Sequence, residues 1–465
     1  MNSLTTKEST MSQLPLSTTA ESAPPRPRPG GGFFTIYVLA YLGAYVGIMG
    51  PGILALYTRL TELFPPAGEG VTSVGALAIV SAAGAIAAAL ANPFIGRLSD
   101  RTTSRFGMRR PWIVVSALVF ALGLLIVTFG PAELTTIAIG WTVSQIGCNG
   151  LLAVYTAVLP DQVPERHRGT VAAWLGVAMN VAALPAVWLV GLFAAGTVTF
   201  DDAGAVIGGE PGSPWRFLAP LVVALLTAAA LFFALTPYDR HLAKSEVTPY
   251  SLRDFFGSFV FDPRKSPDFA WAWISRFFFM LGIAYLLVYQ TPYSQLHLGF
   301  EGPELDAVVL WGTLVMVIGS VITGYASGKL SDVFRRRKVF VVTSALIYAV
   351  SLLFLVFAAP DHSGLPMALV GLFIGGLAQG VYFGVDLALA TDVLPDKDAD
   401  AAKDLGVFNI ASAAPQFVAP FIAPFFLGLT WLGQQPGMNF AALFLFAALF
   451  SAVGALLVMP IRRVR

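Results

Sequence analysis

Twelve long apolar stretches constrain this chain of 465 residues more than any other feature. They fall near residues 33–58, 71–96, 111–131, 133–160, 168–196, 214–236, 269–297, 305–328, 338–359, 364–391, 402–430 and 437–460. A helix needs roughly 20 mostly apolar residues to cross the hydrocarbon core of a bilayer. Only 12% of the residues are charged, against about a quarter in soluble domains. The sequence therefore predicts an all-α polytopic membrane protein with twelve transmembrane helices, whose surroundings are the lipid bilayer.

Polar segments divide these stretches into two groups of six. We expect a disordered cytoplasmic tail at residues 1–32 and a first six-helix bundle at 33–236. A cytoplasmic linker at 237–268 leads to a second six-helix bundle at 269–460 and a cytoplasmic C-terminus at 461–465. The beginning of the tail is rich in Ser, Thr and Pro and lacks the apolar core of about 7–15 residues that a signal peptide needs.

Lys and Arg are distributed very unevenly about the predicted spans. If the tail, every second loop and the C-terminus share one side, 25 of the 28 basic residues lie there, and Arg59 and Arg216 lie on the other side. Cytoplasmic loops carry an excess of Lys and Arg, so we expect both termini in the cytoplasm. Because Arg outnumbers Lys and Ala, Gly and Pro are frequent, we also expect a bacterial source and hence a multi-pass protein of the cell membrane.

Three short motifs recur in the two halves at an almost constant offset. The motif GRLSD at Gly96 returns as GKLSD at Gly328, LPDQVP at Leu159 as LPDKDA, and LGVAMN as LGVFN. Each pair occupies the same topological position, which indicates an internal repeat. Since six is an even number of spans, the halves run in the same direction and are related by an axis along the membrane normal. Proteins built in this way place a substrate site near the midplane, between the halves.

The loop after the second stretch, GRLSDRTTSRFGMRRP, carries a family signal. With six plus six spans and a degenerate copy of this loop after the eighth, the chain resembles the major facilitator superfamily over residues 33–460. The loop motif of that family is G-x-x-x-D-R-x-G-R-R, and the residues that match it or its copy are Gly96, Asp100, Arg101, Gly107, Arg109, Arg110, Gly328 and Asp332. Four extra residues before Gly107 resemble the sugar/cation symporter branches, the glycoside–pentoside–hexuronide and sucrose-type carriers.

The resemblance implies a gating role for this loop. Asp100 would lie at the N-terminus of the eleventh helix near Ala402, and Asp332 near Gly169 at the start of the fifth. A helix N-terminus carries partial positive charge and unpaired N–H groups, which an anion stabilises. The small Gly96 and Gly328 would let backbones approach closely. These contacts would hold the cytoplasmic side shut; the other reading is that the arginines only orient the chain.

Two ionisable residues stand out inside the predicted spans, Arg276 and Asp386. Such residues mark functional sites by default because they are costly in the bilayer unless paired or hydrated. At 1.5 Å per residue they lie about 10 and about 12 Å from the same membrane face, so we expect an ion pair. Three readings stay open: a structural clamp of the second half, a pair broken by protonation of Asp386 during transport, and an Arg276 that reaches to the interface beside Trp271 and Trp273.

Neutral polar side chains on the fourth, seventh and tenth spans predict a substrate cavity. Gln379 and Tyr382 share one helical stripe with Asp386. The other predicted lining residues are Gln145, Asn149 and Gln290. Amides and phenols suit hydroxyl-rich ligands because they both donate and accept hydrogen bonds without demanding an opposite charge.

These features predict a secondary active transporter that imports a small neutral polar solute, a sugar or glycoside, by alternating access in symport with protons. The acidic residues with which melibiose-type carriers coordinate sodium are missing from the second and fourth spans. The alternative is proton-coupled efflux of a drug or lipophilic metabolite, although the fifth span lacks the G-x-x-x-G-P-x-x-G-G motif of such antiporters. We expect a monomer. We also expect no enzyme, and no metal, cofactor or nucleic acid as partner, because the four histidines are scattered and there is one cysteine.

Overall fold

The computed structural model describes residues 29–66, 71–193, 196, 198–200, 206–242, 263–264, 266–334, 336–393, 401–430 and 438–461. Within these residues, twelve helices are long and apolar enough to span a membrane, which confirms the predicted all-α polytopic membrane fold. The tail predicted at 1–32, the linker predicted at 237–268 and the predicted C-terminal segment lie largely outside the described residues, so the domain boundaries remain predictions.

The first half contributes six spans. Its helices are α1 (Gly31–Gly50) with a π-helical turn at Pro51–Ala55 and α2 (Leu56–Thr61), then α3 (Ser73–Ser99), α4 (Arg110–Phe129), α5 (Leu134–Gln162), α6 (Glu165–Val181) with α7 (Ala183–Gly191), and α8 (Trp215–Ala234). Two short antiparallel strands, β1 (Thr199–Phe200) and β2 (Val206–Gly208), lie between α7 and α8. The sequence analysis did not anticipate this hairpin, which is too short to carry an alternating pattern.

The second half contributes the other six spans. Its helices are α10 (Pro267–Leu296), α11 (Gly302–Phe334), α12 (Arg337–Phe357), α13 (Leu365–Val393) after a 3-10 turn at His362–Gly364, α14 (Ala401–Leu427) and α15 (Phe440–Leu457). Helix α11 packs against α13, and α12 packs against α13 and α15.

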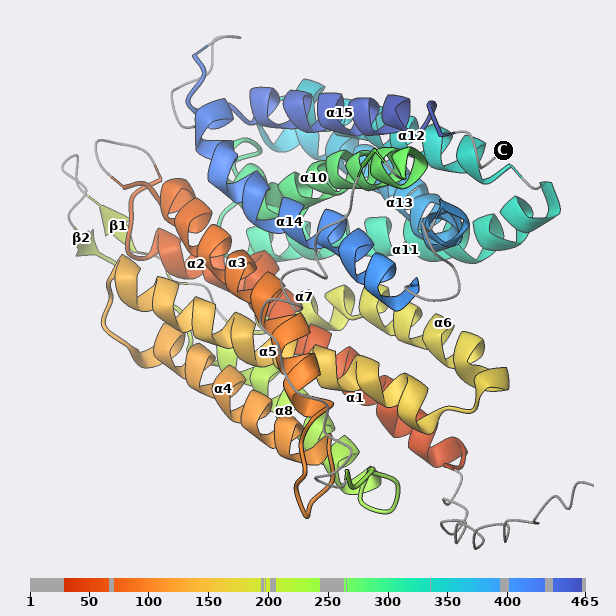
Figure 1. Cartoon of the computed structure of the whole chain (residues 1–465). Helices are drawn as coiled ribbons and strands as arrows, with labels where there is room; N and C mark the ends of the chain where they lie inside the picture. Colours follow the sequence, from red (N-terminus) through yellow and green to blue (C-terminus); the bar gives the residue numbers. More distant parts are fainter. Residues whose placement is uncertain are drawn as a thin grey trace, which may run out of the picture.

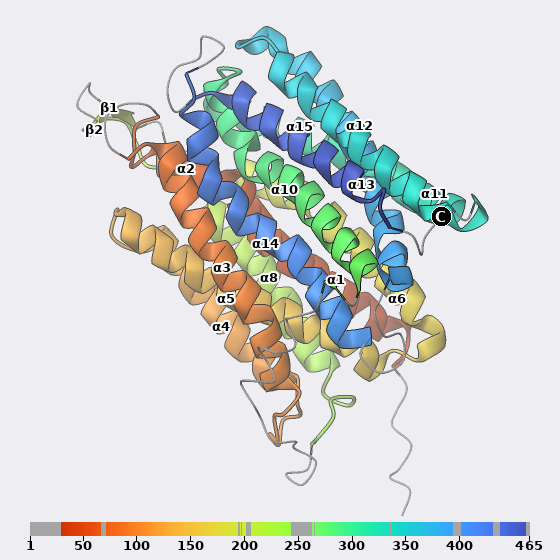
Figure 2. The same ribbon diagram turned by 45° about the horizontal axis from the view of Figure 1, so that its top comes forward.

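The helices of the two halves form two bundles that lie side by side (Figure 1). They meet where α3 runs along α14 and where α7 packs against α11, and the pairing of α3 with α14 is also visible in the second view (Figure 2). Helix α1 begins, α3 ends and α15 ends at one end of the bundles, which we call the basic end because it carries the arginine-rich loop between α3 and α4. The end with β1 and β2 is called the opposite end.

Small residues let the helices of each bundle approach closely. A Cβ atom at Gly147 would overlap the backbone of Phe120, and one at Gly376 would overlap the backbone of Met316, so glycine is required at both helix crossings. Interfaces between membrane helices are enriched in such residues, because lipid supplies little hydrophobic drive for association. Cys148 of α5 is fully buried at another crossing, where its thiol contacts the carbonyl oxygen of Ala44 in α1 at 3.7 Å.

Candidate functional site

The turn between α3 and α4 depends on Gly107 and Asp239. Gly107 has φ +96°, in the left-handed region that glycine favours, and a Cβ atom there would overlap the carboxylate of Asp239. Asp239 follows α8 and accepts hydrogen bonds from the backbone N–H groups of Arg109 at 3.0 Å and of Arg110 at 2.9 Å. Those N–H groups open α4, so the acid that follows the sixth span caps the third. Burial raises the pKa of Asp239, and the N–H donors of Arg110 and Arg109 oppose this rise.

Arg109 is the centre of the loop's side-chain contacts. Its Nη1 lies 2.6 Å from Oδ1 of Asp100 and 2.9 Å from Oγ of Ser99, and its Nε lies 2.7 Å from Oδ2 of Asp161 at the end of α5. Burial acts to lower the pKa of Arg109, but the hydrogen bonds and charges of Asp161 and Asp100 outweigh burial and raise it. Arg110 lies over the ring of Phe232 in α8, with its Cζ 4.2 Å from the ring centroid. The loop thus joins α3, α4, α5 and α8 within one bundle.

Asp100 differs from the expectation in its partner. We predicted it at the N-terminus of α14, but within the described residues its ion pair is with Arg109 of its own loop, and its side chain is 56% exposed. Among the described residues, a Cβ atom at Gly96 would meet only the Cβ of Ala153 at 3.9 Å, so the close approach expected at Gly96 stays a prediction. Gly328 and Asp332 lie in α11, but their side-chain surroundings fall outside what the structure describes. The gating role of the loop stays a prediction.

Sequence reasoning passed over two acids that hold this loop. Asp161 belongs to the repeated LPDQVP motif, so the repeat itself was the signal that could have identified it. Asp239 lies in the segment after the sixth span and carries no comparable signal, because its contact with the loop spans 130 residues of sequence. Arg101 follows α3, where its backbone N–H donates to the carbonyl oxygen of Leu98.

A second cluster lies inside the C-terminal bundle, toward the basic end. Arg276 of α10 forms an ion pair with Asp386 of α13 through Nη1 and Oδ2, and these side chains are 13% and 6% exposed. The Nε of Arg276 donates to Oγ of Ser412 in α14 at 2.6 Å, and its guanidinium lies 4.6 Å from the ring centroid of Phe408. The structure therefore brings together Arg276 and Asp386, which the sequence predicted to lie at a similar depth in the membrane. Arg276 turns toward these partners, which leaves clamp and proton coupling as the readings that its contacts support.

Tyr382 completes this cluster. It lies one helical turn before Asp386 on α13, and its fully buried ring stacks on Phe279 with a centroid distance of 3.7 Å. The predicted helical stripe placed Tyr382 beside Asp386, as the structure has it. In this conformation, however, Tyr382 does not line an open cavity, because its ring is buried and the aromatic ring of Phe279 covers it.

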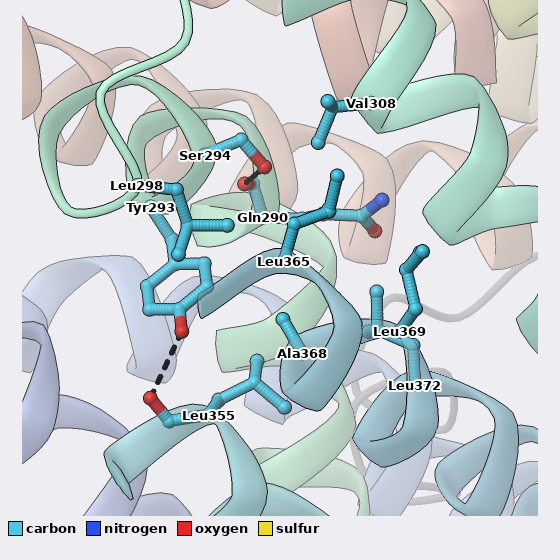
Figure 3. Close-up of a pocket in the computed structure, with 10 residues that line it drawn as sticks. All are labelled: Gln290, Tyr293, Ser294, Leu298, Val308, Leu355, Leu365, Ala368, Leu369 and Leu372. Carbon is cyan, nitrogen blue, oxygen red and sulfur yellow. Dashed lines mark hydrogen bonds between the residues drawn. The ribbon is translucent and has the colours of Figure 1, made fainter. Parts of the chain in front are cut away.

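The structure does not gather the predicted cavity residues into one pocket. Gln145 and Asn149 lie half-buried on α5, where Nδ2 of Asn149 donates to Oε1 of Gln145 at 3.2 Å, and Gln379 lies half-buried on α13. Gln290 of α10 lines a small pocket inside the C-terminal bundle (Figure 3). The rest of its lining is mostly leucine, together with Tyr293, which donates to the carbonyl oxygen of Leu355 at 2.9 Å. This pocket lies among α10, α11, α12 and α13 and so is not the midplane site expected between the halves.

Two six-helix bundles with a parallel repeat, a basic loop between the second and third spans and a buried ion pair define a polytopic transporter. The chain belongs to the Major Facilitator Superfamily, whose pattern it matches over residues 30–329 and 308–465. It is therefore a multi-pass membrane protein of a family of secondary transporters, which confirms the resemblance at the level of the superfamily.

Two curated relatives are transport proteins. The chain is 30% identical over 172 residues to the inner membrane metabolite transport protein YhjE of Escherichia coli, a match that spans 36% of each protein. It is 25% identical over 421 residues to the cis,cis-muconate transport protein of Acinetobacter baylyi, which covers 87% of this chain and 90% of that protein.

Solved structures share the fold. The nucleoside transporter NupG matches with a TM-score of 0.69 at 11% identity, over 92% of this chain and 99% of that one. The peptide transporter POT in complex with sulfate also matches with a TM-score of 0.69, at 15% identity, over 94% and 96% of the two chains. These relatives differ in what they carry, so the comparisons leave the solute of this chain to the argument below.

Proposed function

We propose that this protein imports a small, electrically neutral polar solute, a sugar or a glycoside, in symport with protons by alternating access. The observation that carries the proposal is the Arg276–Asp386 pair buried between α10 and α13. The longer loop before Gly107, which resembles sugar/cation symporters, supports the solute class. The basic end faces the cytoplasm of a bacterial cell in this proposal, with both termini on that side, because Lys and Arg concentrate there.

A buried ion pair gives protonation a large effect. Removing one partner leaves an uncompensated buried charge, which costs about 3–5 kcal/mol. Protonation of Asp386 has this consequence for Arg276, whose Nε also holds Ser412 of α14. Since α14 runs along α3 of the other bundle, a change at the pair reaches the surface between the bundles. The proton can therefore bias which end of the protein is open.

The charge balance of the pair favours a neutral solute. Asp386 already neutralises Arg276, whose other hydrogen-bond partner is the neutral hydroxyl of Ser412 on α14, and the side chain of Gln379 on α13 is also neutral. A second candidate is proton-coupled import of a small carboxylate, which is supported by the relative named as a cis,cis-muconate transporter. An anion of that kind would need to draw Arg276 away from Asp386.

Uptake by the purified protein in proteoliposomes tests the proposal. We expect a labelled sugar or glycoside to accumulate when the outside is acidic and not when the pH is equal on both sides, with nucleosides, cis,cis-muconate and a lipophilic dye as competing solutes. Sugar uptake that does not depend on the pH gradient would rule out proton symport. Accumulation of muconate alone would favour the second candidate, and dye extrusion without sugar uptake would favour efflux.

The variant Asp386→Asn tests the role of the pair. We expect it to lose accumulation driven by the pH gradient by at least about tenfold while it still exchanges solute across the membrane at equal pH, because the amide cannot release a proton. Glu304→Gln is the matched control, since it removes a carboxylate from an exposed position on α11, away from the pair. If Asp386→Asn accumulated solute like the unmodified protein, the pair would be only a clamp.

A further inference from the structure

Two histidines join two connections of the C-terminal bundle at the opposite end. The ring of His297, just after α10, donates from Nε2 to the carbonyl oxygen of Ala358, just after α12, at 3.1 Å. In return, the ring of His362, in the 3-10 turn before α13, donates from Nε2 to the carbonyl oxygen of Gly299 at 2.9 Å. Each connection thus supplies one histidine and one carbonyl group. We call these two reciprocal hydrogen bonds the histidine clasp.

Backbone geometry and ring stacking hold the clasp in place. Gly299 has φ +80°, in the left-handed region that glycine favours, and a Cβ atom there would lie 3.6 Å from Nε2 of His362. The ring of His297 stacks on Tyr293 of α10 with a centroid distance of 4.9 Å. The ring of His362 stacks on Phe300 of the other connection at 4.3 Å. The connection between α10 and α11 and the connection between α12 and α13 therefore pack as one unit.

The two histidines of the clasp differ in their exposure to water. His297 is only 6% exposed, whereas His362 is exposed. Because a carbonyl oxygen only accepts hydrogen bonds, Nε2 of each ring carries a hydrogen, and Nδ1 is the atom that takes up a further proton. Burial lowers the pKa of His297, although the carbonyl of Ala358 acts to raise it. A proton therefore binds His297 more readily after the ring has left its buried position.

The other titratable groups on the segments around His297 do not offset its burial. No carboxylate among the described residues forms an ion pair with His297, and the causes of its pKa shift are burial and the Ala358 carbonyl. The acids at the start of α11 and before α13 are exposed, apart from Asp306, which lies against the end of α7. Helix α15 contributes only phenylalanine rings to the contact with Tyr293 that the structure describes. The titratable groups of these segments are Tyr293, Glu301, Glu304, Asp306, Asp361 and His362.

We propose that the histidine clasp is a pH switch, in which protonation of His297 releases the connection between α10 and α11 from the end of α12. The bond from His362 to Gly299 persists, because Nε2 of a histidine donates in both protonation states. The opening is therefore local and reversible. In the orientation proposed above, the opposite end faces the outside, so the clasp responds to external pH at a place separate from Asp386. Helix α10, whose end is released, also bonds to the first span through Thr291 and Ile53.

Hydrogen–deuterium exchange of the full-length protein in lipid nanodiscs tests the switch. Exchange at pH 8 and pH 5 is converted to protection factors, which removes the effect of pH on the chemical exchange step. We expect the amides of Leu298, Gly299 and Phe300, which bond to carbonyl groups near the end of α10, to lose protection in acid. The loss should be at least about threefold, since a single proton can change the opening equilibrium by up to about tenfold per pH unit.

The variant His297→Gln keeps an N–H donor for the Ala358 carbonyl but does not titrate, so its protection should be the same at both pH values. His362→Gln is the matched control, because it removes the other histidine of the clasp and should keep the acid response. The amide of Gly130, which bonds to Ile126 in the connection between α4 and α5, should be unaffected by acid in all three proteins.

Three outcomes would refute the switch. They are equal protection of the unmodified protein at both pH values, an acid response lost only in His362→Gln, and an equal loss of protection at Gly130. The comparison within the unmodified protein decides even if His297→Gln does not fold. The readout needs no solute, pH gradient or membrane orientation, so a failed switch leaves the proposed symport standing, and a failed symport leaves the switch standing.

Discussion

Gly107 sets the shape of the loop between α3 and α4 because its backbone adopts φ +96° directly against Asp239. An L-residue in the left-handed region costs about 1–2 kcal/mol before any overlap is counted. From the position that this turn gives it, Arg109 reaches both Asp100 and Asp161. The loop motif is therefore a folding element of the N-terminal bundle as well as a candidate gate.

The variant Gly107→Ala should lower the thermal stability of the purified protein, with a loss of at least about 1–2 kcal/mol from backbone strain. Gly96→Ala is its control: it lies in the same motif, but the new Cβ would meet only Ala153 at 3.9 Å. Unfolding followed by fluorescence in detergent compares the two. Equal losses in both variants would show that the turn at Gly107 is not required.

At the scale of the element, α10 links most features of the C-terminal bundle. It carries Arg276 toward the basic end, Gln290 beside the pocket, Thr291 at the contact with the first span, and Tyr293 beneath His297. One helix thus connects the candidate proton site to the end where the bundles touch. A rotation or tilt of α10 would be felt at both places.

His297, just after α10, should make stability depend on pH. Its ring is buried against Tyr293, and burial lowers its pKa although its hydrogen bond to the carbonyl of Ala358 acts to raise it. The folded state therefore binds this proton less readily than the unfolded state, whose histidine titrates at about 6.5. Stability should fall as pH drops below about 6.5 and level off once the lowered folded pKa is passed.

Thermal unfolding between pH 8 and pH 5 measures this effect. The slope should diminish in His297→Gln and persist in His362→Gln, since His362 is exposed. An unchanged slope in His297→Gln would assign the pH dependence to other groups.

The features that could be predicted from the sequence are those that the thickness of the membrane and the helical rise determine directly. Span length follows from bilayer thickness, and the shared depth of Arg276 and Asp386 follows from a rise of 1.5 Å per residue. The rotation of each helix about its axis is instead set by packing against neighbours. For this reason Tyr382 could be placed beside Asp386 but not against Phe279, and the amides of α5, α10 and α13 could not be assigned to one cavity.

For the whole molecule, the bundles meet along α3 and α14, and at the opposite end Thr291 bonds to Ile53 and Asp306 lies against the end of α7. At the basic end, Asp100 is more than half exposed and pairs within its own bundle. We predict that the alternating-access cycle includes a second arrangement, in which Asp100 acquires a partner at the N-terminus of α14.

The variant Asp100→Asn should therefore lose transport while it still inserts and folds, because the neutral side chain interacts less strongly with a helix N-terminus. Uptake in proteoliposomes measures transport, and monodisperse gel filtration reports folding. Arg105→Gln, in the same loop but with no ion pair to an acid among the residues that the structure describes, is the control and should retain uptake. Normal uptake by Asp100→Asn would mean that the loop charges only orient the chain in the membrane.

Cys148 has a practical consequence for following these motions. Its thiol is wholly enclosed between α5 and α1, so water-soluble maleimides and spin-label reagents should not reach it in the folded protein. The natural chain can then serve as its own background for site-directed labelling. Probes attached to introduced cysteines on the two bundles, at either end, would report the distance between the halves during turnover. No native residue would have to be removed first.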